Sequence, residues 1–172
     1  HLSVRNSGLY INRALARYHQ HNLRGAMADY DLALDMDPNN FIGHYNRGLL
    51  RAQVGDDNRA IEDFNFVIEM EPDNMMAIFN RGLLLEQTGD LRGAVKDYTT
   101  VLEEYPNFLV GYQCRGNALK KLGDRKGAEA DELVLLKAHL DEQNGVKKPK
   151  ADEEKTRKKS DKNMDNYRKI VV

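Results

Sequence analysis

Histidine and cysteine are the residue types in this sequence that most often carry catalysis or bind metals. His19 and His21 stand two positions apart, so on a helix they point to different sides and predict no metal site. Cys114 has no base at helical spacing, which favours an inert small apolar group over a nucleophile. The sequence contains no phosphate-binding loop, dinucleotide fingerprint or nucleophile elbow. We therefore expect a protein that is not an enzyme and needs no cofactor or metal.

Arginine and aspartate form a second candidate set, because both recur at an interval of 34 residues. Each Asp follows its Arg by sixteen positions: Arg13 and Asp29, Arg47 and Asp63, Arg81 and Asp97, Arg115 and Asp131. The planar guanidinium fork can hold a carboxylate with two hydrogen bonds, so we expect a ladder of Arg–Asp pairs between helices. A charge that repeats in every unit of an array is typical of structure, and we predict no catalysis from these pairs.

The interval itself predicts the elements that carry these residues. Proline and alanine keep the same phase as the Arg and Asp series, at Pro38, Pro72 and Pro106 and at Ala26, Ala60, Ala94 and Ala128. Apolar residues recur at helical spacing twice within each interval, which predicts two helices per repeat. The four predicted repeats span residues 7–40, 41–74, 75–108 and 109–142.

A short turn divides the two predicted helices of each repeat. It reads Gly-Asp at residues 55–56, 89–90 and 123–124, where Gly supplies the left-handed residue and Asp is expected to cap the next helix. The first repeat has His21 and Asn22 instead. Asn can cap, and His is among the residues found more often with positive φ, so we expect the same turn there.

Small residues face large ones in a regular series. Ala14, Gly48, Gly82 and Gly116 on the first helices meet the alanines of the second helices, beside Tyr30, Phe64 and Tyr98. With the prolines, this series resembles the tetratricopeptide repeat family. The resemblance implies an all-α, right-handed superhelical solenoid of four helix-turn-helix repeats. Glu132 and Leu140 depart from the pattern in the last repeat, which suggests that this repeat ends the array.

The resemblance also implies a concave surface lined by the first helices, where an asparagine series at Asn12, Asn46 and Asn80 is expected to face. It is similar to the asparagine ladder with which some arrays of the family bind peptides, because a side-chain amide matches a peptide unit. The alternative is that each Asn bonds to a neighbouring helix and keeps the array in register. The other expected concave residues are Tyr18, Tyr45, Leu49, Phe79, Leu83 and Glu86.

These features predict a non-enzymatic scaffold that binds an extended peptide of unidentified sequence. One branch of the family grips the C-terminal carboxylate of chaperones, but most of its cationic positions fall here on Ile11, Met76 and Asn80, or on Tyr45, Val110 and Cys114. That carboxylate clamp is absent. The alternatives are a self-assembling structural element, which would use the array ends and exchange of the tail, and an accessory domain of a larger protein.

Charge divides the chain into an acidic body and a basic tail. The net charge is −1, but ten Lys or Arg and five Asp or Glu lie from Gly145 onward. We expect residues 143–172 to form a charged tail and residues 1–6 to be a lead-in, either the end of a longer array or the start of the first helix. The tail and the apolar array ends offer sites for self-association. We expect no nucleic-acid partner and no membrane span, and the sequence leaves the compartment open.

Overall fold

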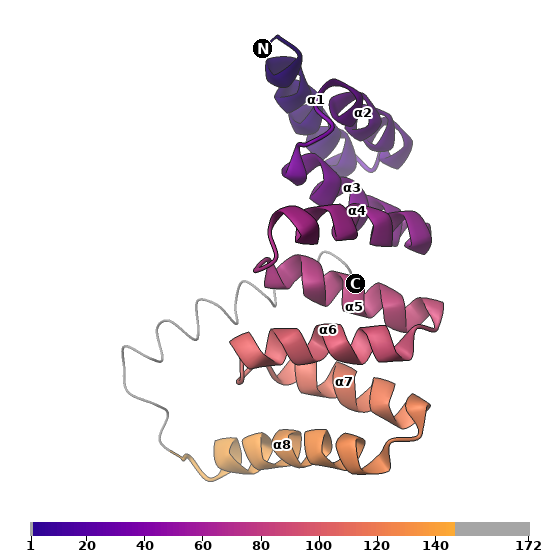
Figure 1. Ribbon diagram of the computed structural model, residues 1–172. Coiled ribbons are helices and arrows are strands. Elements are labelled where there is room, and N and C mark those ends of the chain that lie inside the picture. The colour runs from indigo at the N-terminus through magenta and orange to yellow at the C-terminus, as the bar shows by residue number, and fades with distance from the viewer. Residues whose placement is uncertain (1, 147–172) are drawn as a thin grey trace. The chain divides into compact units, whose positions relative to one another are not determined.

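The computed structural model describes residues 2–146, with side chains from residue 6 onward, and the regular elements of this range are all α-helices. The prediction of an all-α fold with two helices per repeat is confirmed. The helices of the described range are α1 (Leu2–His19), α2 (Leu23–Met36), α3 (Phe41–Gln53), α4 (Asp57–Met70), α5 (Met75–Thr88), α6 (Leu91–Glu104), α7 (Leu109–Leu122) and α8 (Arg125–Gln143) (Figure 1). Most of the predicted tail, residues 147–172, lies outside the described residues.

The helices belong to two compact units, His1–Ala77 and Ile78–Val172. In the first unit α1 packs against α2, α2 against α3, and α3 against α4. In the second unit α6 packs against α7 and α7 against α8. Within each unit these helices therefore pack on neighbours in the sequence, as expected for an array of helical pairs.

Left-handed residues end the first helix of each pair. Gly55, Gly89 and Gly123 have φ values of 85°, 96° and 84°, and His21 has a φ of 61°, as the sequence predicts. The side chains of Asn22, Asp90 and Asp124 then accept the backbone N–H three residues further on and cap the second helix. The predicted Asp56 cap is wrong. The Asp56 side chain makes no capping bond, and its carboxylate instead lies 3.9 Å from the Arg59 guanidinium.

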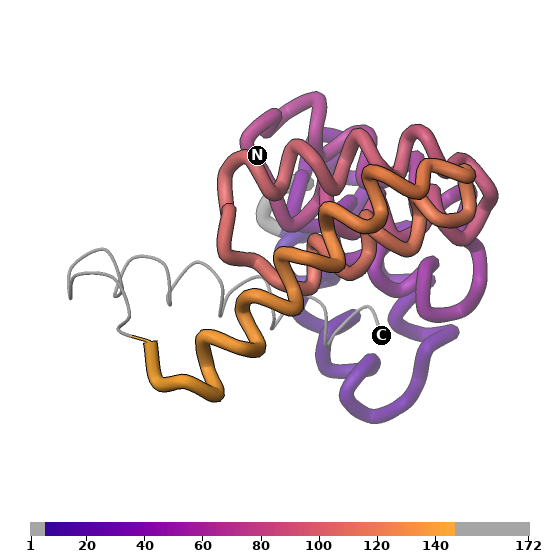
Figure 2. Tube along the Cα trace, turned by 90° about the horizontal axis from the view of Figure 1, so that it is seen from below, coloured from indigo at the N-terminus to yellow at the C-terminus, as the bar shows by residue number. Residues whose placement is uncertain are grey.

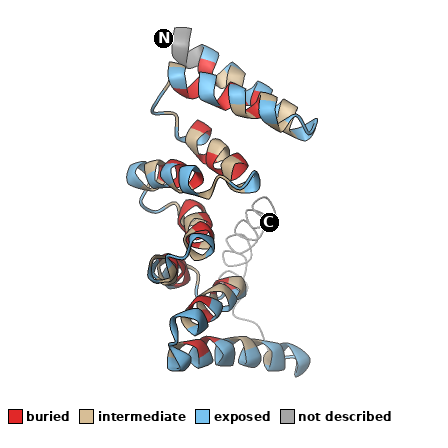
Figure 3. Ribbon diagram, turned by 90° about the vertical axis from the view of Figure 1, so that its right-hand side faces the viewer, coloured by how far each residue is buried: buried red, intermediate tan, exposed pale blue. Residues whose placement is uncertain are grey.

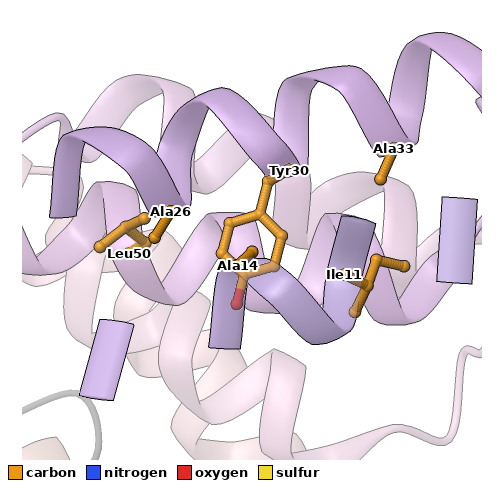
Figure 4. Close-up of a cluster of buried hydrophobic side chains, with 6 residues drawn as sticks. All are labelled: Ile11, Ala14, Ala26, Tyr30, Ala33 and Leu50. Atoms are coloured by element: carbon orange, nitrogen blue, oxygen red, sulfur yellow. The ribbon is translucent and has the colours of Figure 1, made fainter. Parts of the chain in front are cut away.

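The core of the first unit shows how small residues admit an aromatic ring. Ala14 of α1 and Ala26 of α2 are completely buried, and the Tyr30 ring lies between the two helices beside them (Figure 4). Burial raises the pKa of the Tyr30 hydroxyl to about 12. The Tyr30 hydroxyl therefore stays neutral in its apolar surroundings at physiological pH.

Glycine replaces alanine at the same place in the later pairs, where the ring approaches more closely. A Cβ atom on Gly82 would lie 2.9 Å from Cε1 of Tyr98, and one on Gly48 would lie 3.1 Å from Cζ of Phe64. Gly116 differs, because its nearest neighbour would be Cβ of Asp131 at 3.4 Å. The last pair has Glu132 where the others have a ring, and this leaves space beside Gly116.

The first and last helices are longer than the others. α1 begins at Leu2, so the described part of the predicted lead-in belongs to the first helix. α8 has 19 residues and continues to Gln143 without a break, as the orange helix in Figure 2 shows. The predicted proline position of this repeat holds Leu140, which allows the helix to continue.

We expect the change Gly82→Ala to lower the free energy of unfolding by about 1–2 kcal/mol, because the new methyl group would overpack against the Tyr98 ring. Gly116→Ala is the matched control. There the methyl group meets only ordinary contacts, and the higher helix propensity of alanine should raise the free energy of unfolding by about 0.5–1 kcal/mol. Urea unfolding followed by circular dichroism measures both. Equal effects of the two changes would contradict this account of the packing.

Candidate functional site

The structure brings together all four Arg–Asp pairs that the sequence predicts. In each pair Nε and Nη2 of the arginine donate to the two carboxylate oxygens of the aspartate, at distances of 2.6–3.0 Å. The four aspartates are buried between their two helices. The two-bond geometry fixes the angle of the guanidinium plane as well as its distance. These pairs therefore hold the helices together and leave no free carboxylate for chemistry.

Asp63 is the most heavily contacted of these carboxylates. Besides Arg47, it accepts a hydrogen bond from Nη1 of Arg51 at 2.8 Å, and Nδ1 of His44 lies 3.0 Å from its Oδ1. The other ring nitrogen of His44 lies 2.8 Å from the carbonyl oxygen of Pro38. The His44 ring also stacks on Phe66 with 3.9 Å between ring centroids. His44 thus joins α3 to α4 and to the loop before α3.

Arginine partners keep the carboxylates of Asp29 and Asp63 ionised. The Arg13 hydrogen bonds outweigh burial and lower the pKa of Asp29. Burial would raise the pKa of Asp63, but the hydrogen bonds from His44 and Arg47 and the charges of Arg47 and Arg51 together lower it. Both carboxylates are therefore charged at neutral pH, which suits a structural role.

The asparagine series defines a second candidate site, which we call the asparagine face. It is the side of the first helix of each repeat that carries the asparagine series, together with residues about one and two turns further along the same helix. In the first unit these residues are Asn12, Leu15 and Tyr18 of α1 and Asn46, Leu49 and Gln53 of α3. In the second unit they are Asn80, Leu83 and Glu86 of α5 and Cys114, Asn117 and Lys121 of α7.

Side-chain bonds show that this face is continuous between neighbouring first helices within each unit. The Tyr18 hydroxyl donates to Oε1 of Gln53 at 2.9 Å, which joins α1 to α3. In the second unit Nζ of Lys121 donates to Oε2 of Glu86 at 3.0 Å, which joins α7 to α5. Both bonds span 35 residues, so the two units use equivalent positions. The predicted positions therefore form one continuous surface within each unit.

Glu86 also accepts a hydrogen bond from a buried tyrosine. The Tyr98 hydroxyl donates to Oε1 of Glu86 at 2.9 Å. Burial raises the pKa of Tyr98, and the charge of Glu86 raises it further, so the hydroxyl keeps the proton that it donates. Glu86 is thus held by two donors, one on α6 and one on α7.

Exposure separates the predicted concave residues into two groups. Asn12 is exposed, and Asn46, Tyr18, Leu83 and Glu86 are half-buried, so all five remain accessible.

Tyr45, Phe79, Leu49 and Asn80 are buried, and the prediction that they form an open contact surface is not met in this structure. The Tyr45 ring packs edge-on against Phe64, and the Phe79 ring packs against Tyr98 and Phe108. Tyr45 and Phe79 lie at the border between the asparagine face and the core. An aromatic ring at this border reaches inward between the helices.

Gln53 and Lys121 complete the asparagine face, although our sequence analysis does not single them out. Gln recurs at Gln87, 34 residues after Gln53, but His19 and Lys121 hold the equivalent positions of the first and last repeats, so this position has no constant residue type. The available signal was a polar partner at a spacing of 35 residues from Tyr18 and from Glu86. This spacing places two residues on adjacent first helices, one position apart in the repeat.

Within residues 2–146, no three His, Cys, Asp or Glu side chains gather in a way that could hold a metal ion. Cys114 is half-buried on α7. Among the helices of this range, none has both the length and the apolar character required to span a membrane.

Comparison with known proteins identifies the repeat. The family model described as "Tetratricopeptide repeat" matches residues 45–107. No curated protein matches the chain.

Solved structures share the fold at low sequence identity. A crystal structure of MamA has 17% identity and a TM-score of 0.73, and 81% of each chain is covered. MamA from Desulfovibrio magneticus RS-1 has 16% identity and a TM-score of 0.72, over 78% of this chain and 76% of that one. The first repeat domain of Spaghetti (RPAP3), bound to the HSP90 peptide SRMEEVD, has 22% identity and a TM-score of 0.64, over 70% and 95%. These similarities show the fold alone.

We expect Asp63→Asn to lower the free energy of unfolding by about 3–5 kcal/mol, because it leaves the buried charges of Arg47 and Arg51 without their carboxylate. Asp31→Asn is the control, since Asp31 also binds Arg47, at 3.0 Å, but its side chain is 51% exposed. That change should cost less than about 1 kcal/mol. Denaturant titration measures both, and similar losses would show that burial of the pair does not matter.

Acid should destabilise the protein through the same carboxylates. The pKa values of Asp29 and Asp63 are lowered in the folded state, so their stabilisation is complete above the unfolded value of about 4. It is lost as the pH falls from about 4 towards the lower folded values. We expect the midpoint of urea unfolding to drop over this range, and to drop less in Asp63→Asn. An equal drop in the variant would exclude Asp63 as a source of the acid sensitivity.

Proposed function

We propose that this chain, whose residues 45–107 match the tetratricopeptide repeat model, is a non-enzymatic scaffold that binds an extended segment of another protein on its asparagine face. The observation that supports this most directly is the pair of accessible amides on adjacent first helices, Asn12 on α1 and Asn46 on α3. The Tyr18–Gln53 bond joins the same two helices on this face. A ligand lying across them meets both amides.

The chemistry of the first unit fits a peptide backbone. An Asn side chain offers an acceptor and two donors, the same groups as a peptide unit, so it can bind an extended chain whatever its side chains are. Leu15 lies one helical turn beyond Asn12 and is exposed, and Ile42 lies one turn before Asn46 and is half exposed. These two residues offer apolar contacts beside the amides. We infer a ligand that presents backbone groups together with apolar side chains.

The asparagine faces of the two units differ in charge. In the first unit the face has no charged member, whereas in the second unit it contains Glu86 and Lys121, which already bind each other. Asn80 is completely buried, and Cys114 stands where a fourth Asn would be. Amide recognition is therefore assigned to the first unit, and the second unit offers charged and polar contacts.

The proposed ligand is unlike a chaperone carboxylate. The RPAP3 domain of similar fold is bound to an HSP90 peptide, which is an example of a peptide on this fold. Here the matching cationic positions are held by Ile11, Met76 and Asn80 or by Tyr45, Val110 and Cys114, none of which carries a positive charge. We therefore infer recognition by neutral hydrogen bonds, with an affinity that depends little on salt.

The test starts from peptides selected on the purified protein from a random library displayed on phage. The affinity of the best synthetic peptide is measured by calorimetric titration. Each amide hydrogen bond contributes about 0.5–1.5 kcal/mol, so Asn12→Ala with Asn46→Ala should weaken binding about fivefold to 100-fold. Asn58→Ala is the control, because Asn58 is an exposed Asn near the start of α4 and lies outside the asparagine face.

Three results would count against this function. They are no enrichment of any peptide, equal affinities for the double variant and for the wild type, and an equal loss in Asn58→Ala. Light scattering without peptide tests the alternative of a self-assembling element, in which the molecular mass rises with protein concentration.

A further inference from the structure

α8 carries an apolar stripe on the side that faces away from α7. Leu133, Leu136 and Leu140 are 63%, 52% and 45% exposed. Their spacing of three and four residues places them on one narrow line of the helix. We call these three residues the leucine stripe. Figure 3 shows most of this helix in the colour of exposed residues.

The equivalent side of earlier second helices receives the next helix. Leu34 of α2 and Leu102 of α6 stand at the repeat position of Leu136. A Cβ atom on Gly43 of α3 would lie 3.0 Å from Leu34, and one on Gly111 of α7 would lie 2.7 Å from Leu102. In both units this side is therefore a docking surface for a helix. On α8 no described helix occupies it.

The chemistry of this side changes at α8. Arg47 donates through Nη1 to Asp31 at 3.0 Å, and Arg115 donates through Nη1 to Thr99 at 3.3 Å. Both acceptors stand at the repeat position that Leu133 holds on α8. A further helix of the same kind would bring an arginine to a leucine, which offers no acceptor. The leucine stripe therefore suits an apolar occupant that is not another repeat.

A second copy of the chain fits the leucine stripe poorly. In head-to-tail stacking, α1 of the copy would present Leu9 where Gly43 and Gly111 allow close approach, and Nη1 of its Arg13 would meet Leu133, which offers no acceptor. Pairing of α8 with α8 of a copy would bury little more than three leucines on each side. Stable interfaces bury about 800 Å² per partner. Neither arrangement provides enough complementary surface.

We propose that residues 161–172 of the same chain bind along the leucine stripe. They contain Met164, Tyr167 and Val171, whose spacing of three and four residues matches that of the stripe. Twenty-six residues follow Val146, so residues 147–160 remain as a tether to the end of α8. A tethered segment is present at an effective concentration of about millimolar, which makes a small contact sufficient.

The charges also match. After the buried Asp131, α8 carries one lysine, Lys137, against three acidic residues, Glu132, Asp141 and Glu142, of which Glu132 binds Lys120 of α7. Residues 161–172 carry Lys162, Arg168 and Lys169 against Asp161 and Asp165, a surplus of one positive charge, and both positive charges beside Tyr167 and Val171 come after the last acidic residue. Opposite charges at the edges of an apolar contact favour this pairing over random association. The site lies outside the asparagine face and does not depend on the proposed function.

The experiment uses the full chain with ¹³C-labelled leucine methyl groups, observed by NMR at a concentration where light scattering gives a monomer mass. We expect nuclear Overhauser contacts from the Tyr167 ring to methyl groups of the leucine stripe. Tyr167→Asp with Val171→Asp should abolish these contacts and shift the stripe resonances. Asn163→Asp with Asn166→Asp adds the same charge outside the three apolar positions and should leave the shifts of the stripe unchanged.

Two outcomes would overturn the proposal. Stripe resonances that are identical in the wild type and both variants would mean that the segment does not bind there. Contacts that appear in a sample mixed from differently labelled chains, and that weaken on dilution, would assign the stripe to a second copy. Leu133→Asp with Leu136→Asp gives a further check. These side chains are exposed, so the fold should persist, while the Tyr167 resonances should move to the positions of a free segment.

Discussion

One buried carboxylate in each helix pair sets the distance and rotation of the two helices. Its arginine partner reaches across with two parallel hydrogen bonds, which are satisfied only in one relative orientation. The same aspartate lies against the small residue of the first helix, since a Cβ atom on Gly48 would be 3.2 Å from Cβ of Asp63. The ion pair and the close approach of the helices are therefore a single constraint. The aromatic rings of each pair pack in the space that this constraint leaves between the two helices.

The four buried aspartates have different numbers of partners around their carboxylates. Asp63 has Arg47, Arg51 and His44, and Asp29 has Arg13 with Arg17 at 3.2 Å. Removing a carboxylate from water is costly, and the cost is offset only when its oxygens are fully hydrogen-bonded. The additional arginines, Arg51 beside Asp63 and Arg17 beside Asp29, help these carboxylates to stay ionised while buried. They also make the first unit the more highly charged of the two interiors.

The sequence predicted the elements that repeat, because a period of 34 residues leaves a statistical trace at each recurring position. The Arg–Asp pairs and the left-handed His21 are of this kind. It could not predict how far the side chains on the asparagine face are covered, since helical phase gives a direction and neighbouring side chains decide the depth. Tyr45 and Phe79 were assigned to the surface and are buried for this reason. Asp56 keeps the residue type of a cap but lacks the capping bond, and its carboxylate lies 3.9 Å from the Arg59 guanidinium.

The Tyr18–Gln53 and Glu86–Lys121 bonds have a consequence for cooperativity. Each joins one repeat to the next within its unit, and in a linear array such links between neighbours decide whether the repeats unfold together or singly. Both bonds lie on the surface assigned to the ligand. A ligand that binds one of these groups would replace a hydrogen bond between adjacent repeats with a contact to the ligand. Occupancy of the surface is thereby coupled to how strongly adjacent repeats depend on each other, so a bound segment could stiffen or loosen the array without changing its fold.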